Sequence, residues 1–218
     1  MRMKPTSKMK IELALICALL TLYLTRHWFG GAGWSAAVAI VIFFVPIAYM
    51  KISRRILAEI YLTKKNLKES LSYGLIGSVA LVSTSVLILH YFLGGFYLPP
   101  ELKEPVWWFP VASFLGTLLT TGLYEEVFFR GFLQMHLKGY LSDFWDVLVQ
   151  AVIFALLHPR YYIEGLYYIS FLAFAFGAVA GFIALRTRNL SGPILMHGLY
   201  DTAGLMLFYV HPIVPGAR

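Results

Sequence analysis

Three short stretches of the sequence place titratable side chains within apolar segments. Two adjacent glutamates, Glu125 and Glu126, stand in YEEVFFRGF; His158 ends FALLH; and the stretch HGLYD runs from His197 to Asp201. A glutamate, two histidines and a further carboxylate can deprotonate a water and stabilise an oxyanion, or can hold a metal ion. These residue types therefore indicate either hydrolysis by an activated water or a metal site.

The spacing within two of these stretches predicts which side chains pair. Glu126 and Arg130 are four residues apart, so they lie on one helix face and can form an ion pair. His197 and Asp201 have the same spacing. Neighbouring helical residues point about 100° apart, so Glu125 cannot squarely share the partner of Glu126. We expect Glu125, which has no such partner on its own helix, to be the carboxylate left free to act as a general base.

The elements that carry these residues are apolar helices. The chain is 59% hydrophobic and 13% charged, whereas soluble domains are about one-quarter charged. A membrane-spanning helix needs about 20 mostly apolar residues, and such segments lie at 11–29, 34–50, 71–93, 106–135, 144–158, 166–185 and 192–210. We therefore predict an all-α fold: a polytopic membrane helix bundle of about seven transmembrane helices with an intramembrane polar cavity. Residues 1–218 form a single integral membrane domain in this prediction.

The net charge of +7 comes largely from basic residues beside the apolar segments. They precede the first segment and gather again at 51–68, between the second and third. Such clusters mark the cytoplasmic face and contact anionic lipid. We expect a cytoplasmic N-terminus, anionic lipid at the 51–68 loop and no nucleic-acid partner. Helical rise places Glu125 roughly 28 Å along the fourth segment, toward the cytoplasmic side in this topology.

Each polar stretch also has a purely structural interpretation. Glu126 and Arg130 can be an ion pair that locks a helix into the bundle, His158 a hydrogen-bonded interior histidine, and His197 with Asp201 an interhelical polar clasp. A charge at membrane depth costs about 2.5 to 3.5 kcal/mol, however, so three such sites together favour function. A proton-coupled carrier also holds such residues, often in two repeated halves. The sequence has no internal repeat, which makes a carrier the less favoured alternative.

The three stretches together resemble the motifs of the CPBP intramembrane proteases. This family comprises type II CAAX prenyl endopeptidases and bacteriocin-processing (Abi) or immunity proteins, and its pattern is EExxxR, then FxxxH, then HxxxN on successive helices. The matching residues here are Glu125-Glu126-Val-Phe-Phe-Arg130, Phe154-Ala-Leu-Leu-His158 and His197-Gly-Leu-Tyr-Asp201. The motifs occur in family order, and the resemblance covers residues 106–210, the expected catalytic core. Residues 1–105 are expected to be accessory N-terminal helices.

The resemblance implies an intramembrane endopeptidase that hydrolyses a membrane-associated or lipidated peptide. Glu125 would activate the water, His158 would help to hold it, and His197 would help to stabilise the oxyanion. Glu126 and Arg130 would support and orient these groups, with Phe154 packed beside them. The resemblance requires no cofactor but leaves open a divalent metal such as zinc, with Glu125, His158 and His197 as its ligands. A catalytically silent membrane scaffold or immunity protein of the same family is the alternative from another functional class.

Asp201 departs from the family pattern, which has asparagine at this position. An asparagine amide can donate a hydrogen bond to an oxyanion, whereas an ionised carboxylate can only accept one. Asp201 would therefore orient His197 and favour its imidazolium form, so that His197 is the donor. A protonated Asp201 and a metal-bound Asp201 are the other two interpretations. Among these three, we favour the orienting role.

Overall fold

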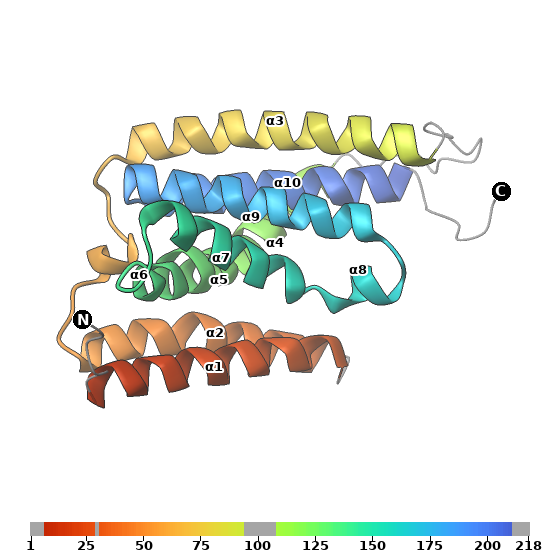
Figure 1. Cartoon of the computed structure of the whole chain (residues 1–218). Coiled ribbons are helices and arrows are strands. Elements are labelled where there is room, and N and C mark those ends of the chain that lie inside the picture. Colours follow the sequence, from red (N-terminus) through yellow and green to blue (C-terminus); the bar gives the residue numbers. More distant parts are fainter. Residues whose placement is uncertain (1–6, 29–30, 94–107, 211–218) are drawn as a thin grey trace.

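The described residues of the protein, 7–28, 31–93 and 108–210 of a computed structural model, form helices and connecting turns without any strand (Figure 1). The long helices are α1 (Ser7–Trp28), α2 (Ala32–Ile52), α3 (Leu67–Leu93), α7 (Asp143–Leu156), α9 (Tyr167–Thr187) and α10 (Ser191–Val210). A continuous helical run consists of α4 (Phe109–Thr117), η2 (Leu118–Gly122), α5 (Leu123–Glu126), η3 (Val127–Leu133) and α6 (Gln134–Leu137). Two short helices, η1 (Leu57–Ile60) and α8 (Pro159–Ile163), lie in connections.

The all-α prediction is confirmed, and each predicted apolar segment corresponds to one long helix or to the run from α4 to α6. Among the described residues, three helices are long and apolar enough to cross a membrane: Ala32–Ile52, Leu67–Ile88 and Tyr167–Thr187. α7, for example, has only 14 residues. The count of about seven transmembrane helices therefore stays a prediction.

The helices form a layered bundle (Figure 1). α3 and α10 lie side by side along one edge, and α1 and α2 lie along the opposite edge. The run from α4 to α6 passes between them, and α7 packs against α9. This arrangement places the segments that carry the three polar motifs in the interior of the bundle.

The contact between α3 and α10 depends on small residues. The hydroxyl of Ser70 accepts a hydrogen bond of 2.8 Å from the backbone N–H of Gly192. A Cβ atom added to Gly192 would overlap the backbone carbonyl of Ser70, and one added to Gly74 would overlap the carbonyl of Gly192. Close backbone approach through small residues is how helices associate in membranes, where lipid removes the hydrophobic driving force.

Gly192→Ala is expected to destabilise the protein by about 1 to 3 kcal/mol, because the two backbones must separate to admit the methyl group. Thermal unfolding in detergent measures the effect. Gly204→Ala, on the same helix, is the matched control, since a Cβ there meets no atom within 4 Å. Equal stability of the two variants would show that the α3–α10 contact does not require close approach.

Two wider turns interrupt the run from α4 to α6. η2 and η3 are π-helical, and they flank the four residues of α5 that carry Glu125 and Glu126. π-Helical turns inside α-helices occur frequently at functional sites because they redirect side chains locally. A Cβ on Gly131 in η3 would lie 2.9 Å from the carbonyl oxygen of Ile60, so glycine permits η1 to approach there.

The basic 51–68 loop is held against the turn between α9 and α10. The amide of Asn189 donates to the carbonyl oxygens of Thr63 and Lys65, both at 2.7 Å, and that of Asn66 donates to the carbonyl of Thr187. Exposed basic side chains from both segments therefore share one end of the bundle: Lys51, Arg54, Lys64, Lys65, Lys68, Arg186 and Arg188.

Candidate active site

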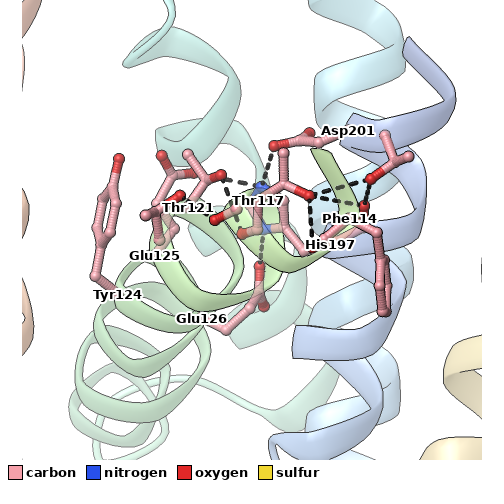
Figure 2. A network of polar contacts seen from close by, with 12 residues as sticks. Phe114, Thr117, Thr121, Tyr124, Glu125, Glu126, His197 and Asp201 are labelled. Carbon is pink, nitrogen blue, oxygen red and sulfur yellow. Dashed lines mark hydrogen bonds and ion pairs between the residues drawn. The ribbon is translucent and has the colours of Figure 1, made fainter. Parts of the chain in front are cut away.

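A buried chain of charged groups joins two of the three sequence motifs. Oε1 of Glu126 accepts a hydrogen bond of 2.8 Å from Nη1 of Arg130 and lies 2.7 Å from Nδ1 of His197. Glu126 and Arg130 are fully buried, and His197 is almost so. The predicted pair between Glu126 and Arg130 is therefore confirmed. Figure 2 shows how His197 projects from α10 toward the helical run that carries Glu126.

Arg130 is held by aromatic rings as well as by Glu126. Its guanidinium carbon lies 4.3 Å from the ring centroid of Phe154 and 5.4 Å from that of Phe176. Its Nε and Nη2 atoms make no hydrogen bond to any described residue. The cation therefore depends on one ion pair and on the faces of these rings, and Phe154 packs beside the site as expected.

Glu125 also has partners, contrary to the expectation that it is left free. Its Oε1 atom accepts a hydrogen bond of 2.7 Å from the hydroxyl of Tyr23 and lies 3.1 Å from Nη1 of Arg26. Both partners belong to α1, about one hundred residues earlier in the chain. The expectation was wrong because it considered only partners on the same helix, whereas tertiary packing brings α1 against α5.

His197 lies among three carboxylates. Nδ1 contacts Glu126, while Nε2 lies 3.5 Å from Oδ2 of Asp201 and 3.8 Å from Oε2 of Glu125 (Figure 2). Since the ionised Glu126 only accepts, Nδ1 carries the proton. Asp201 is on the same face of α10, as its spacing predicted, and its side chain is 31% exposed.

His158 lies just beyond the C-terminal end of α7. The predicted segment 144–158 is therefore two residues too long, because the residue before a proline disfavours the helical conformation and Pro159 follows. Nδ1 of His158 lies 2.8 Å from the carbonyl oxygen of Phe154 and must donate to it. In the neutral ring Nε2 is then an acceptor. The imidazole stacks on Tyr161 and contacts the Tyr23 ring edge-on, with centroid distances of 5.7 and 6.3 Å.

The site lies at different distances from the first residues of two helices that run in the same direction. Helical rise places Arg26 about 28 Å from the first residue of α1, but His197 only about 9 Å from the first residue of α10. The two helices are parallel in Figure 1. The site therefore lies near the last residues of α1 and near the first residues of α10, and its cytoplasmic location stays a prediction.

Comparison with protein families gives a second line of evidence on the class of this protein. Residues 106–203 match the family model described as type II CAAX prenyl endopeptidase Rce1-like. This segment is a CAAX-protease domain of the CPBP family. Searches of curated proteins and of solved structures return no match. The family, together with the apolar helices, indicates an integral membrane protein and a CAAX-type intramembrane protease.

The CAAX-protease domain does not contain the whole polar site. Tyr23 and Arg26 lie outside residues 106–203, in a helix that was expected to be accessory. A sequence signal for them exists, because α1 repeats inward-facing residues at alternating intervals of four and three: Glu12, Ile16, Leu19, Tyr23 and Arg26. This spacing is typical of a helix face packed against another helix. Because Arg26 lies at the end of this face, a polar partner for it is expected on the neighbouring helix.

The arrangement of donors does not fit a zinc ion at the residues expected to hold one. Arg26 lies 3.1 Å from Oε1 of Glu125, and a cation beside a ligand oxygen opposes a second cation. Nδ1 of His158 and Nδ1 of His197 already have oxygen partners, which leaves Nε2 of each ring as the nitrogen that could bind a metal. Among residues 7–28, 31–93 and 108–210, no group of three or more His, Cys, Asp or Glu side chains is placed to hold a metal.

Proposed function

We propose that the protein is an intramembrane endopeptidase in which Glu125 activates water to hydrolyse a membrane-associated or lipidated peptide. The observation that carries this proposal is the separation of 3.8 Å between Oε2 of Glu125 and Nε2 of His197. This separation exceeds a direct hydrogen bond but suits a shared water or a substrate oxygen. A carboxylate acceptor and an imidazole donor therefore face one small space.

The reaction needs only groups of this chain and one water. Oε2 of Glu125 removes a proton from the water, and the resulting hydroxide attacks the carbonyl carbon of the scissile peptide bond. Nε2–H of His197 donates to the oxyanion that forms. Glu125 then returns the proton to the leaving nitrogen as the C–N bond breaks, leaving a free carboxyl and a free amine. His158 helps to hold this water.

The pairing of charges supports an imidazolium at His197. Glu126 is paired with Arg130, and Glu125 with Arg26. Asp201 is the remaining carboxylate, and a cationic His197 balances it at 3.5 Å. A buried charge that lacks a partner is costly, so Asp201 favours the protonated ring that donates to the oxyanion.

Asp201→Asn and Asp201→Ala are expected to lower kcat by a similar factor, roughly tenfold, because both remove the negative charge. This factor corresponds to about 1.4 kcal/mol of transition-state stabilisation. Cleavage of a prenylated CAAX peptide by the purified variants measures it, with Thr202→Ala, the next residue of α10, as control. Full activity of Asp201→Ala would remove Asp201 from the mechanism, and full activity of Asp201→Asn alone would favour the amide of the family pattern.

Mass spectrometry of membrane peptides tests the function without a known substrate. Cells that produce the wild-type protein should contain cleaved termini that are missing from cells with Glu125→Ala. Glu69→Ala is the matched control, since Glu69 is an exposed glutamate in the first turn of α3. Identical termini in all three would contradict the protease proposal. A cellular phenotype that survives Glu125→Ala would favour the scaffold or immunity alternative, and Glu125-dependent proton flux in liposomes would favour a carrier.

A chelator distinguishes this mechanism from one that uses a divalent metal such as zinc. Activity that persists in excess chelator supports water activation by Glu125 alone. Activity that is lost in chelator and restored by zinc would assign Glu125, His158 and His197 to a metal that reorganises them.

The exposed basic residues of the 51–68 loop are proposed to contact anionic lipid. Arg55 is the exception, because it is paired with Glu12 and Glu59. The apolar side chains of Ile52 and Ile56 stand exposed within this basic segment. Cationic and apolar side chains together suit a membrane–water interface.

A further inference from the structure

The inner face of α1 carries a polar group near each end and apolar residues between them. Ile16, Leu19 and Tyr23 are buried on this face, while most other positions of α1 are half-buried or exposed. Glu12 precedes them by one turn and Arg26 follows by one turn. Helical rise separates Glu12 from Tyr23 by about 16 Å. The helix is thus anchored by polar contacts at two levels of the bundle.

The first anchor fixes the position of α1 along the bundle. Oε1 of Glu12 accepts hydrogen bonds from the hydroxyl of Tyr49 at 2.8 Å and from Nη1 of Arg55 at 3.3 Å. Its Oε2 lies 3.5 Å from Nε2 of His136, which belongs to α6 at the end of the helical run that carries Glu125. Sliding of α1 by one turn would break all of these contacts.

The second anchor is on Glu125 itself. The hydroxyl of Tyr23 and Nη1 of Arg26 both approach Oε1, and the Tyr23 side chain is fully buried. Arg26 also donates to the hydroxyl of Tyr124. Its guanidinium carbon lies 5.0 Å from the Tyr23 ring centroid and 5.8 Å from that of Tyr124. Two aromatic rings and two acceptors therefore hold this cation in one orientation.

We propose that Tyr23 and Arg26 are positioning residues which bind Oε1 of Glu125 and thereby make Oε2 the reacting oxygen. The inference rests on the proposed function, which it deepens. The two oxygens of a carboxylate are chemically equivalent until their neighbours differ. Here one oxygen accepts from two donors of α1, and the other faces Nε2 of His197 at 3.8 Å. Turning the carboxylate out of this position would break both contacts with α1. Oε2 of Glu125 therefore stays directed toward the water.

The proposal makes α1 part of the catalytic apparatus. The CAAX-protease domain at 106–203 supplies the base and the oxyanion donor. The residues that orient this base belong to α1, which lies outside that domain.

Tyr23→Phe tests the proposal most conservatively, since it removes one donor and keeps the buried ring. Loss of a hydrogen bond to a charged group should lower kcat about tenfold or more. KM should stay within about twofold of the wild-type value. Arg26→Gln should lower kcat further, and Arg26→Lys should recover part of that loss because it keeps a charged donor. Tyr73→Phe, at a partly exposed tyrosine of α3, is the matched control. Unchanged kcat in Tyr23→Phe and Arg26→Gln, measured on protein with wild-type thermal stability, would overturn the proposal.

A second measurement does not depend on peptidase activity. Hydrophobic carbodiimides modify carboxyl groups within membranes when those groups are protonated and uncovered. Mass spectrometry should find Glu125 modified faster in Arg26→Gln and in Tyr23→Phe than in the wild type, with Glu69 as internal reference. Equal rates would overturn the positioning role even if the protein cleaves peptides. Faster labelling in a protein that cleaves nothing would retain the positioning role and reject the proposed function instead.

Discussion

Glu125→Gln is expected to lower kcat by about a thousandfold or more, with KM nearly unchanged. The amide keeps the shape of the side chain and can still accept from Tyr23, but it cannot take a proton from water. General base catalysis contributes roughly 10²- to 10⁴-fold to rate, and a loss of about a thousandfold lies in the middle of this range. The assay is cleavage of a prenylated CAAX peptide by purified protein in liposomes.

The matched control for this result is Glu69→Gln, which changes a glutamate of α3 that is exposed. Glu69→Gln should retain full activity, and both variants should unfold near the wild-type temperature. Substantial turnover by a well-folded Glu125→Gln protein would contradict the assignment of Glu125 as the base.

The second large effect concerns stability. Arg130→Met is expected to lower the free energy of unfolding by about 3 to 5 kcal/mol, because it leaves Glu126 buried without its cation. Glu126→Gln should have a similar effect, since it strands Arg130 among Phe154 and Phe176. The double variant should be more stable than either single variant, because neither charge then remains unpaired. Equilibrium or thermal unfolding in detergent measures all three.

An exposed ion pair on the same part of the chain is the control. Nζ of Lys138 lies 3.2 Å from Oδ1 of Asp143, and their side chains are 35% and 61% exposed. Lys138→Met should therefore cost less than about 1 kcal/mol. Comparable losses in Arg130→Met and Lys138→Met would show that burial of the Glu126–Arg130 pair carries no special cost.

Side-chain spacing within one helix was enough to predict much of the site. Glu126 with Arg130 and His197 with Asp201 form the predicted pairs, because residues four apart on a helix are neighbours wherever the helix packs. The apolar segments likewise locate the long helices, since burial in lipid or in the bundle requires the same composition. Hydrophobicity does not reveal where a helix widens, however, and the π-helical turns on both sides of α5 were not predicted.

Contacts between distant segments were beyond the same reasoning. The link between Glu126 and His197 joins residues 71 apart, and that between Tyr23 and Glu125 joins residues 102 apart. Both depend on how helices pack side by side, which spacing along one helix does not determine. Arg26 lies outside the three motifs, yet it contacts the glutamate expected to be free. The spacing of the α1 face is the one sequence feature that could have suggested this contact.

The contacts of α1 with Glu125 make the proposed active site depend on both halves of the chain. The family match begins at residue 106, and the motifs within it hold the reacting groups. The orientation of Glu125 depends on Tyr23 and Arg26, far from those motifs. We therefore expect that a fragment without α1 would retain the motif residues. Its Glu125 carboxylate, however, would lose most of the contacts that orient it.

Cleavage in heavy-oxygen-labelled water tests the central claim most directly. If Glu125 activates water for direct attack, the new carboxyl terminus of the peptide should carry the heavy oxygen after a single turnover, Glu125 itself should remain unlabelled, and Glu125→Gln should form no product. Heavy oxygen in the Glu125 side chain, or an acyl-enzyme trapped by hydroxylamine, would show that Glu125 attacks the peptide as a nucleophile and would contradict the claim.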